Sequence, residues 1–343
     1  MKAWPNYSTG SSVYAVRIEQ HHRRKTPVGG IMTSYHIIPD IHGHADKLTR
    51  LLDRIGWQRT ASGWRAPVQG ARLAFLGDFI DRGPENGPVL ATVRDLIDGG
   101  HAVAVMGNHE LNAIHYHHFD DDTGQPLRPH SDDNTKQHSS FLNEFPLGSV
   151  EAGDWIDWMK TLPLWLDTGA FRMVHACWSP QDIATMVPQA EHAQQGRLPP
   201  ALIVAAGKDS HPLNDMVETV TKGPEVPLPP GYFFADGGGK RRKHVRHAWW
   251  RNDAETWAEG TVSVPDDAIL PPGQMPPEAI AMTYDKAEKP VFFGHYWMRG
   301  DFLIESENAL CLDYSAGRDG PLIAYRFETG DTGLSRDRVI GFD

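Results

Sequence analysis

Three short polar strings, each directly after an apolar stretch, constrain this chain more than any other feature. They are DIHG at 40–43, GDFIDRG at 77–83 and GNHE at 107–110, and two isolated histidines follow, His175 in VHAC and His295 in FFGH. An apolar stretch that ends at a polar loop predicts a buried strand whose end presents polar side chains. Aspartate, asparagine and histidine supply oxygen and nitrogen ligands for divalent cations. The order of the strings therefore predicts a site for a pair of metal ions.

The residues between the strings alternate between strand and helix patterns. Apolar runs at 36–39, 72–76 and 102–106 predict buried strands that each end at one of the strings. Between them, apolar residues recur at helical spacing, at Leu48, Leu51, Leu52 and Ile55 and again from Val89 to Ile97. This alternation predicts a mainly parallel sheet with helices packed on it, and ligands gather beyond the carboxyl ends of such strands.

The second half of the chain is expected to add further strands. A Trp-rich helix is expected from Asp154 to Leu166, followed by a strand at 171–174 that leads into His175. Another strand at 291–293 leads into His295. Because strands at 309–312 and 322–327 come after it, we expect the chain to end in a second sheet.

The length and composition predict one large domain. The chain has 343 residues, 40% of them hydrophobic, which is enough to bury a sizeable core. Residues 1–34 are expected to form a poorly ordered tail, and residues 35–343 a single domain. We expect insertions near 115–140 and 223–280. The first is either a solvated excursion or a mobile flap over the site, and the second is proline-rich and typical of a surface excursion.

The charge and the cysteine content exclude several classes of protein. A formal net charge of −11 argues against general nucleic-acid binding and against a membrane-surface protein. No stretch approaches the ~20 apolar residues of a membrane span, and the absence of an export signal favours a cytoplasmic protein. Cys177 and Cys311 are the only cysteines, and we expect two buried free thiols rather than a disulfide framework.

The three strings and two late histidines resemble the calcineurin-like metallophosphoesterase superfamily, in its phosphoprotein phosphatase branch. That branch carries GDxHG, GDxxDRG and GNHE followed by two histidines. The second and third patterns match in full, whereas Pro39 replaces the first glycine. The resemblance implies an α/β (α+β) fold, a two-sheet β-sandwich flanked by helices, with the ligand loops at the carboxyl ends of strands.

By this resemblance, six side chains would hold two divalent metal ions. Asp78 would bridge both ions. The first would also be bound by Asp40 and His42, and the second by Asn108, His175 and His295. A ligand set of oxygens and imidazoles without thiolate suits manganese, our first choice, and also iron or zinc.

The same resemblance assigns roles beside the metals. His109 would protonate the leaving oxygen and Asp81 would orient it, since imidazole is suited to proton transfer near neutral pH. Arg82 would grip the phosphoryl group, because its planar fork matches two oxygens, and Asn108 would also face the substrate.

Four further features are expected near the site. Arg251 resembles an arginine that binds phosphate between the two late histidines. The basic stretch 240–251 is either a solvated hairpin edge or a wall that attracts an anionic substrate. Asp313 is either a carboxylate that orients His295 or His109, or part of a turn. The pair Tyr296-Trp297 replaces a common threonine and would pack in the core or narrow the pocket. Other histidines are expected on loops or helix starts without ligand roles: His44, His101, His115, His117, His118 and His130.

These residues predict a metal-dependent hydrolase of phosphate monoesters that uses a metal-bridged hydroxide directly, without a phosphoenzyme. Phosphoserine or phosphothreonine in proteins is the first expected substrate. A dinucleoside polyphosphate is the second, and a phosphodiester in RNA or a cyclic nucleotide is the third, because the same ligands serve all of them. A catalytically silent binding scaffold is the alternative outside enzymes. It would be expected to lack a ligand, His109 or Arg82, and none is missing. The oligomeric state is not predicted.

Overall fold

A computed structural model describes residues 33–61, 63–235 and 239–342 of the chain. The tail predicted for residues 1–34 lies outside the described residues except for its last two positions. The first strand begins at Ser34, one residue before the predicted start of the domain at residue 35.

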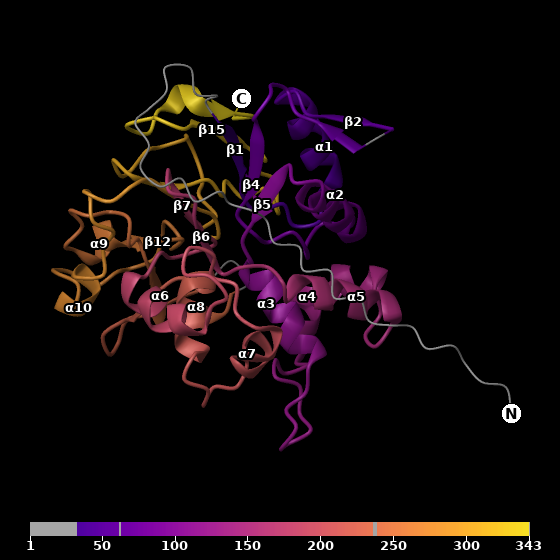
Figure 1. The fold of residues 1–343 in the computed structure, drawn as a ribbon. Coiled ribbons are helices and arrows are strands. Elements are labelled where there is room, and N and C mark those ends of the chain that lie inside the picture. Colours follow the sequence, from indigo (N-terminus) through magenta and orange to yellow (C-terminus); the bar gives the residue numbers. More distant parts are fainter. Residues whose placement is uncertain (1–32, 62, 236–238, 343) are drawn as a thin grey trace, which may run out of the picture. The chain divides into compact units, whose positions relative to one another are not determined.

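The strands that carry the three polar strings form a parallel core. β1 (Ser34–Ile38) pairs in parallel with β4 (Arg72–Phe75), and β4 pairs in parallel with β5 (Ala102–Ala104). On the other side of β1 lie two antiparallel strands, β15 (Ala324–Glu328) and β16 (Val339–Ile340), so that the sheet order is β16-β15-β1-β4-β5. All three strands predicted before residue 107 are therefore present, shortened at their carboxyl ends where the polar loops begin (Figure 1).

A second sheet brings in the two late histidines. Its order is β14-β13-β7-β6, built from β6 (Trp165–Asp167), β7 (Arg172–Val174), β13 (Val291–Phe293) and β14 (Ala309–Cys311). The prediction that the chain ends in this sheet is wrong for its last part. β15 and β16 return to the first sheet, where β15 fills the edge of β1 that the parallel strands leave open. Alternation cannot indicate which sheet a late strand joins, since both offer a buried face.

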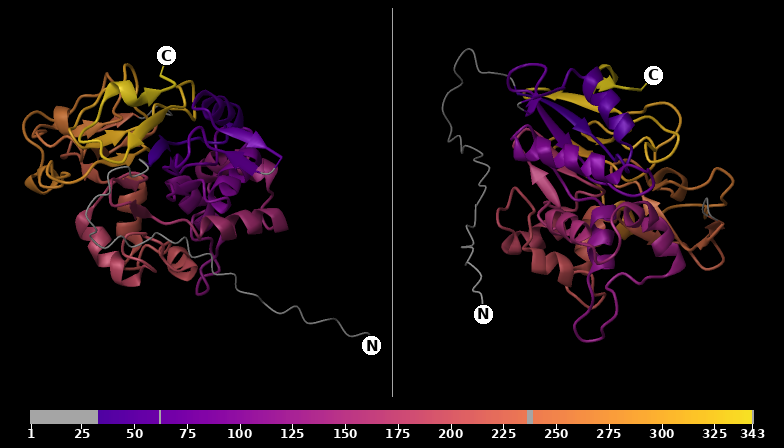
Figure 2. Two further views of the ribbon diagram at one scale, coloured as in Figure 1. Left: turned by 45° about the horizontal axis from the view of Figure 1, so that its top comes forward. Right: turned by 90° about the vertical axis from the view of Figure 1, so that its right-hand side faces the viewer.

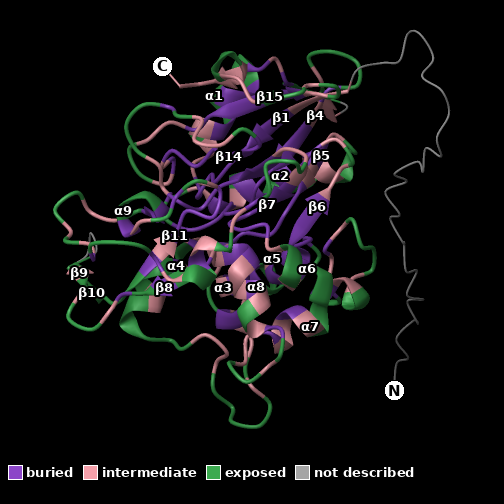
Figure 3. Ribbon diagram, turned by 90° about the vertical axis from the view of Figure 1, so that its left-hand side faces the viewer, coloured by how far each residue is buried: buried purple, intermediate pink, exposed green. Residues whose placement is uncertain are grey.

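Both faces of the first sheet are buried, and each meets a different layer. On β1, Ile37 belongs to the apolar cluster shared with Phe292 and Leu310 of the second sheet, whereas its neighbour Ile38 belongs to the cluster shared with helix residues such as Leu48. Successive side chains of a strand point to opposite faces. The expected two-sheet sandwich with flanking helices is thus confirmed, and Figure 3 shows the buried residues concentrated on these strands.

Helices flank the sheets and gather beyond one end of them. α1 (Ala45–Arg54) and α2 (Asn86–Asp98) follow the helical stripes predicted from the sequence. Figure 2 shows the next helices lying together past the strand ends. They are α3 (Asn108–His117), α4 (Asp132–Glu144), α5 (Val150–Met159), α6 (Pro180–Met186), α7 (Pro200–Ala205) and α8 (Asn214–Lys222), with the 3-10 turn η1 (Val187–Gln189) after α6.

Two helix predictions need correction. The segment 115–140, expected to lack regular structure, is helical at both ends, because α3 extends to His117 and α4 begins at Asp132 with the Ser131 side chain accepting a bond from the backbone N–H of Asn134. Residues 118–131 between them form no helix or strand. The segment is polar because much of α4 faces solvent, although His138 and Phe141 are buried. The Trp-rich helix ends at Met159 rather than Leu166, since Trp165 and Leu166 belong to β6.

The proline-rich region near 223–280 carries short elements of its own. β11 (His244–His247) lies between β8 (Glu225–Pro227) and β12 (Thr261–Val262) in a three-stranded sheet. Small additional elements complete the described residues: the hairpins β2 (Gln58–Thr60) with β3 (Gly63–Arg65) and β9 (Phe234–Ala235) with β10 (Arg241–Arg242), the helices α9 (Trp257–Gly260) and α10 (Pro277–Ile280), and the 3-10 turn η2 (Arg336–Arg338). No helix among the described residues is long and apolar enough to cross a membrane. Cys177 and Cys311 are free and buried, as predicted.

Close approach of the polar loops requires glycine at Gly107. A Cβ atom at this position would overlap with the Asp78 carboxylate and the Asp78 backbone nitrogen. We therefore expect Gly107→Ala to lower the free energy of unfolding by about 1–3 kcal/mol, the usual cost of overpacking a filled interior.

The matched control is Gly153 in α5, where an added Cβ would meet open space. Gly153→Ala should raise the free energy of unfolding by about 0.5–1 kcal/mol, because alanine restricts the unfolded chain more than glycine does. Denaturant titration followed by circular dichroism measures both. Equal stability of the two variants would contradict the close approach at Gly107.

Candidate metal centre

The two sheets direct the polar loops to one place. Asp40 and Asp78 lie two and three residues beyond β1 and β4, and Asn108 is the first residue of α3, a few residues beyond β5. His175 follows β7 directly, and His295 lies two residues beyond β13. Because the strands before these residues end on one side of the sandwich, side chains from distant parts of the chain meet there.

The Asp78 carboxylate lies at the centre of this group. Its Oδ1 is 3.4 Å from Nε2 of His175, and its Oδ2 is 3.6 Å from Nε2 of His42 and 4.0 Å from Nε2 of His109. All four side chains are buried. A single carboxylate thus faces imidazoles from three different loops.

Two sets of three side chains could each hold an ion. The ligand atoms of His42, Asp78 and His109 lie within 4.8 Å of one another, as do those of Asp78, His175 and His295. Asp78 belongs to both sets, which is the arrangement that a bridging carboxylate requires. His109, which we assigned to proton transfer, also lies within reach of the first position.

Asp40 and Asn108 complete the group. The Asp40 carboxylate accepts hydrogen bonds from the backbone N–H of His295 at 3.1 and 3.2 Å, and its Oδ1 is 4.0 Å from Nε2 of His175. Asn108 Oδ1 lies 2.8 Å from His295 Nδ1 and 3.2 Å from His175 Nε2. The structure therefore brings together all six residues predicted to bind metal.

The chemistry of the site fits divalent cations. Nε2 of His42 and Nε2 of His295 are buried, and neither has a hydrogen-bond partner among the residues that the structure describes. Burial holds the pKa of both rings well below its usual range, so both nitrogens are lone-pair donors. A buried polar atom without a partner costs free energy. A metal ion at each position would supply the missing partner.

His175 behaves differently. Burial alone would lower the pKa of His175, but the Asp78 and Asp40 carboxylates raise it to about 10. A proton on His175 therefore neutralises the carboxylates where a cation would otherwise do so, and metal binding must displace that proton.

Glu110 holds two of the polar loops together, a role that we did not predict. Its carboxylate accepts hydrogen bonds from the backbone N–H groups of Asp78 at 2.8 Å, Phe79 at 2.8 Å and Gly107 at 2.9 Å. Burial and the neighbouring Asp78 raise the pKa of Glu110 to about 7. Glu110 is the last residue of the GNHE string, and this position was the only sequence signal for a carboxylate that binds loop backbone rather than metal.

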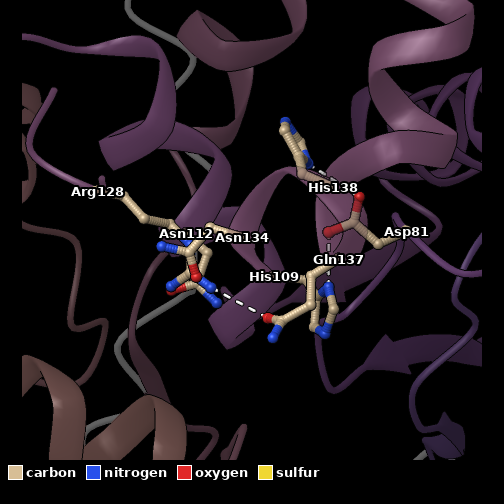
Figure 4. A pocket seen from close by; sticks show the side chains of 7 residues that line it. All are labelled: Asp81, His109, Asn112, Arg128, Asn134, Gln137 and His138. Atoms are coloured by element: carbon tan, nitrogen blue, oxygen red, sulfur yellow. Dashed lines mark hydrogen bonds and ion pairs between the residues drawn. The ribbon is translucent and has the colours of Figure 1, made fainter. Parts of the chain in front are cut away.

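The Asp81 carboxylate lies between two histidines, His109 and His138, which Figure 4 shows. Asp81 Oδ2 lies 2.6 Å from Nδ1 of His109, and Asp81 Oδ1 lies 2.9 Å from Nδ1 of His138. Burial would raise the pKa of Asp81, but hydrogen bonds from His109 and His138 lower it to about 2. Asp81 is therefore an acceptor, and both imidazoles donate to it. His138 Nε2 in turn lies 3.2 Å from His117 Nε2.

His138 was missed because it lies in the segment that we expected to be an insertion. It is separated from Asp81 by 57 residues, and its distance from the site depends on how α4 packs. A polar pocket lies beside His109 and His138 (Figure 4). There the guanidinium of Arg128 donates to Asn112 Oδ1 at 2.6 Å and to Gln137 Oε1 at 3.1 Å.

Arg82 faces an aromatic ring rather than a carboxylate. Its guanidinium carbon lies 4.1 Å from the centre of the Trp297 ring, and Arg82 and Trp297 line a pocket with His42. Tyr296 is fully buried, and its hydroxyl oxygen lies 3.0 Å from Trp249 Nε1. The pair Tyr296-Trp297 was expected either to pack in the core or to narrow the pocket. Tyr296 packs in the core, and Trp297 lines the pocket.

Arg251 lies in a different environment from the one that we predicted. Its guanidinium bonds to the Glu305 carboxylate at 2.7 Å and to the carbonyl oxygens of Glu259 and Thr261. These partners hold both terminal nitrogens of the guanidinium, and Glu305 already supplies it with an anion. Within the basic stretch 240–251, Arg246 is the residue that approaches the site, with Nη1 3.5 Å from the carbonyl oxygen of His295.

Asp313 supports the loop after His295. Its carboxylate accepts bonds from the backbone N–H groups of Trp297 and Ser315, both at 2.8 Å. It thereby acts on the loop backbone, and no direct bond to the His295 or His109 ring is found within the described residues.

Two of the histidines predicted on loops lie in a helix. His115 and His117 belong to α3, and His115 is buried, with Nε2 2.9 Å from the Ile203 carbonyl oxygen. Helical spacing was obscured here because polar imidazoles occupy the buried face.

We expect the protein to bind close to two equivalents of a divalent cation and to unfold at a higher temperature when loaded. Asp78→Asn should lose most of the metal, because both positions share that carboxylate. Asp53→Asn, an exposed position on α1, serves as the control. Affinity should fall as the pH is lowered, because the cation competes with the proton on His175. Metal analysis and calorimetry at two pH values measure these effects, and unchanged metal content in Asp78→Asn would contradict the assignment.

Comparison with known proteins agrees with this geometry. Residues 34–185 match the family model described as calcineurin-like phosphoesterase, a range that includes the three polar strings and His175. An asymmetrical bis(5'-nucleosyl)-tetraphosphatase PrpE of Halalkalibacterium halodurans is 37% identical over 75 residues, which cover 22% of this chain and 30% of that protein. A symmetrical bis(5'-nucleosyl)-tetraphosphatase of a Janthinobacterium species is 30% identical over 169 residues, covering 48% of this chain and 52% of that protein.

A longer match exists at lower identity. The symmetrical bis(5'-nucleosyl)-tetraphosphatase of Thioalkalivibrio sulfidiphilus is 25% identical over 300 residues, covering 82% of this chain and 90% of that protein. The chain spans about a third and about half of the length of the two relatives above. The family model, the sandwich and the grouped side chains agree with one another: residues 34–185 match the calcineurin-like phosphoesterase family, which the three polar strings resemble.

Proposed function

We propose that this chain is a metal-dependent hydrolase of phosphate esters and anhydrides. The observation that carries the proposal is Asp78, which is shared by two sets of ligands and lies 4.0 Å from Nε2 of His109, itself bonded to Asp81. Two divalent cations bound there would polarise the phosphoryl oxygens and lower the pKa of an attacking water.

The side chains around the metals have distinct tasks in this proposal. Arg82 holds the phosphoryl group with its fork of N–H donors. His109 delivers a proton to the leaving oxygen from Nε2, while Asp81 fixes the ring through Nδ1 at 2.6 Å. Water attacks phosphorus directly in this proposal. Neither thiol competes with it as a nucleophile, because burial raises the pKa of both Cys177 and Cys311 well above its usual range.

For the substrate, we place the dinucleoside polyphosphate ahead of the phosphoprotein. Three relatives of this chain are described as bis(5'-nucleosyl)-tetraphosphatases, which supports this order. The complete matches GDFIDRG and GNHE keep a phosphoserine or phosphothreonine peptide as the second candidate. For the metals, we propose manganese, because the ligand set contains imidazole and hard oxygen without thiolate.

A matched panel tests the proposal. Metal-loaded protein is assayed on a dinucleoside tetraphosphate, a phosphoserine peptide and an aryl phosphodiester, and Asp78→Asn serves as the inactive control. We expect the tetraphosphate to give the highest kcat/KM. A higher value for the peptide would move the substrate class to phosphoproteins. No turnover of any compound by protein that holds two metals would refute the proposed activity.

His109→Ala separates the substrate classes further. An alkoxide leaving group needs a proton more than a nucleotide phosphate does, because the phosphate is a weaker base. We expect the variant to lose about 100-fold or more in kcat on the phosphopeptide and clearly less on the tetraphosphate. Equal losses on both compounds would argue against proton delivery from His109.

His138 should act on the rate through Asp81. His138→Leu removes a donor to Asp81 and is expected to lower kcat about tenfold, because the net value of a charge-assisted hydrogen bond is about 1.5–3 kcal/mol. His138→Asn can keep an N–H near the position of Nδ1 and should recover part of the loss. Metal content should be unchanged in both, and His192→Gln, at an exposed position, is the control. Full activity in His138→Leu would show that Asp81 needs no second donor.

A further inference from the structure

A second pocket lies beside His42 and shares no residue with the pocket of Figure 4. Its lining comes from the DIHG and GDFIDRG strings, the loop after His295 and the loop after β14. The lining residues are His42, Arg82, Trp297, Asp313, Ser315, Gly317 and Arg318. Neither the ligand set nor the proton-transfer residues account for Trp297 and Arg318.

Three guanidinium groups surround the Trp297 ring. The guanidinium carbons of Arg82, Arg318 and Arg246 lie 4.1, 4.5 and 5.9 Å from the ring centre. A guanidinium that faces a ring contributes its flat face, and its N–H groups point outward from its edge. Three guanidinium groups therefore lie close to one indole ring, and contact with the ring face does not occupy their N–H donors.

Acidic side chains lie near these cations but do not pair with them. Among the described residues, none of the three forms an ion pair with a carboxylate, although Asp313 lines the same pocket, and the one bond found for their N–H groups is that of Arg246 to the His295 carbonyl oxygen at 3.5 Å. Burial lowers the pKa of Arg82, the Asp78 carboxylate raises it and the nearby Arg318 lowers it again, so Arg82 lies close both to carboxylates and to a like charge.

The loop that carries Arg318 is held in place by a lysine from α1. Nζ of Lys47 donates to the carbonyl oxygens of Ala316 at 2.7 Å, Arg318 at 2.9 Å and Gly320 at 3.0 Å. Asp313 binds the two loops together through its bonds to the backbone N–H groups of Trp297 and Ser315. A Cβ atom at Gly317 would overlap with the His42 ring, so the loop lies directly on a metal ligand. The position of Arg318 is therefore fixed by contacts that do not involve its own side chain.

Like charges gathered next to a site for divalent cations repel one another, and an anion between them removes that repulsion. A guanidinium fork matches two oxygens of a phosphate group. Since Arg82 is assigned to the phosphoryl group that is cleaved, Arg318 and Arg246 are left without an anion of their own.

We propose that Arg318, with Arg246 and the Trp297 ring, forms a second phosphate subsite that binds the phosphate adjoining the one that is cleaved. This inference rests on the proposed phosphohydrolase function and specifies its substrate as a polyphosphate chain. A phosphomonoester fills the position at Arg82 alone, whereas a substrate with consecutive phosphates fills both positions.

Binding of two nucleotides to metal-loaded protein in excess metal tests the subsite without turnover. Adenosine monophosphate offers one phosphate, and α,β-methylene adenosine diphosphate offers two that cannot be hydrolysed at the bridging carbon. We expect wild type to bind the diphosphate at least about tenfold more tightly, the value of one charge-assisted contact. Arg318→Ala should reduce this preference to about twofold or less and leave monophosphate affinity unchanged, with Arg318→Lys in between because lysine lacks the fork.

Two further variants make the result specific. Arg299→Ala removes an exposed arginine from the loop after His295, which is not part of the pocket, and should leave the preference intact. Lys47→Met should release the loop and reproduce the effect of Arg318→Ala. Equal affinity of wild type for the two nucleotides, or an equal loss for both in Arg318→Ala, would overturn the subsite.

Kinetics separates this inference from the proposed function. If wild type cleaves the tetraphosphate, but Arg318→Ala keeps the wild-type ratio of kcat/KM between the tetraphosphate and an aryl phosphate, the subsite is refuted while the function stands. If wild type binds the diphosphate preferentially through Arg318 but hydrolyses none of the phosphate compounds tested, the subsite stands and the proposed function fails.

Discussion

Asp78 ties the three polar loops into one hydrogen-bonded unit, and the site depends on that unit. Its carbonyl oxygen accepts from the backbone N–H groups of Ile41 at 3.0 Å and His42 at 2.9 Å, which fixes the first loop to the second. Its own N–H donates to Glu110 at 2.8 Å, and its Oδ1 accepts from the His109 N–H at 2.8 Å, which fixes the second loop to the third. Each of these groups is buried, so a broken bond would leave a polar group unpaired, at about 1–3 kcal/mol. Hydrogen bonds of the backbone therefore fix the positions of the predicted ligands relative to one another.

The second sheet adds what the first cannot supply. His175 and His295 come from strands that pair with each other in parallel, β7 and β13, and the Gly294 N–H donates to the His175 carbonyl oxygen at 2.8 Å. The two histidines reach Asp78 and Asn108 because residues such as Ile37 and Phe292 pack the sheets face to face. Packing of the sandwich and assembly of the site are thus one event, and a substitution between the sheets should displace both histidines relative to the three loops.

The sequence predicted features that depend on neighbouring residues. It did not predict contacts between residues that are far apart in the chain. The first three strands and two helices follow from periodicity, and the grouping of the six predicted ligands follows from the motifs because each lies just after a strand. Arg251 was chosen from its neighbours Trp249 and Trp250, but Glu305, 54 residues away, holds its guanidinium. His138 and Arg318 carried no pattern, because their proximity to the site depends on the packing of α4 and on the hold of Lys47 over a loop 271 residues away. Pairings of this kind arise from tertiary contacts, which periodicity does not encode.

The surroundings of the predicted metal ligands differ in charge between the His109 side and the His42 side. Beside His109, Asp81 holds two imidazoles by hydrogen bonds, an arrangement for positioning a proton. Beside His42, arginines surround Trp297 without acidic partners among the described residues, an arrangement for holding anions. The whole chain carries a net charge of −11, so its overall field repels a polyanion. Attraction must therefore come from the local guanidiniums and the bound cations, whose field acts within about 10 Å at moderate salt. In the proposed function, a polyphosphate substrate would be oriented with its phosphate chain toward the arginines and its leaving group toward His109.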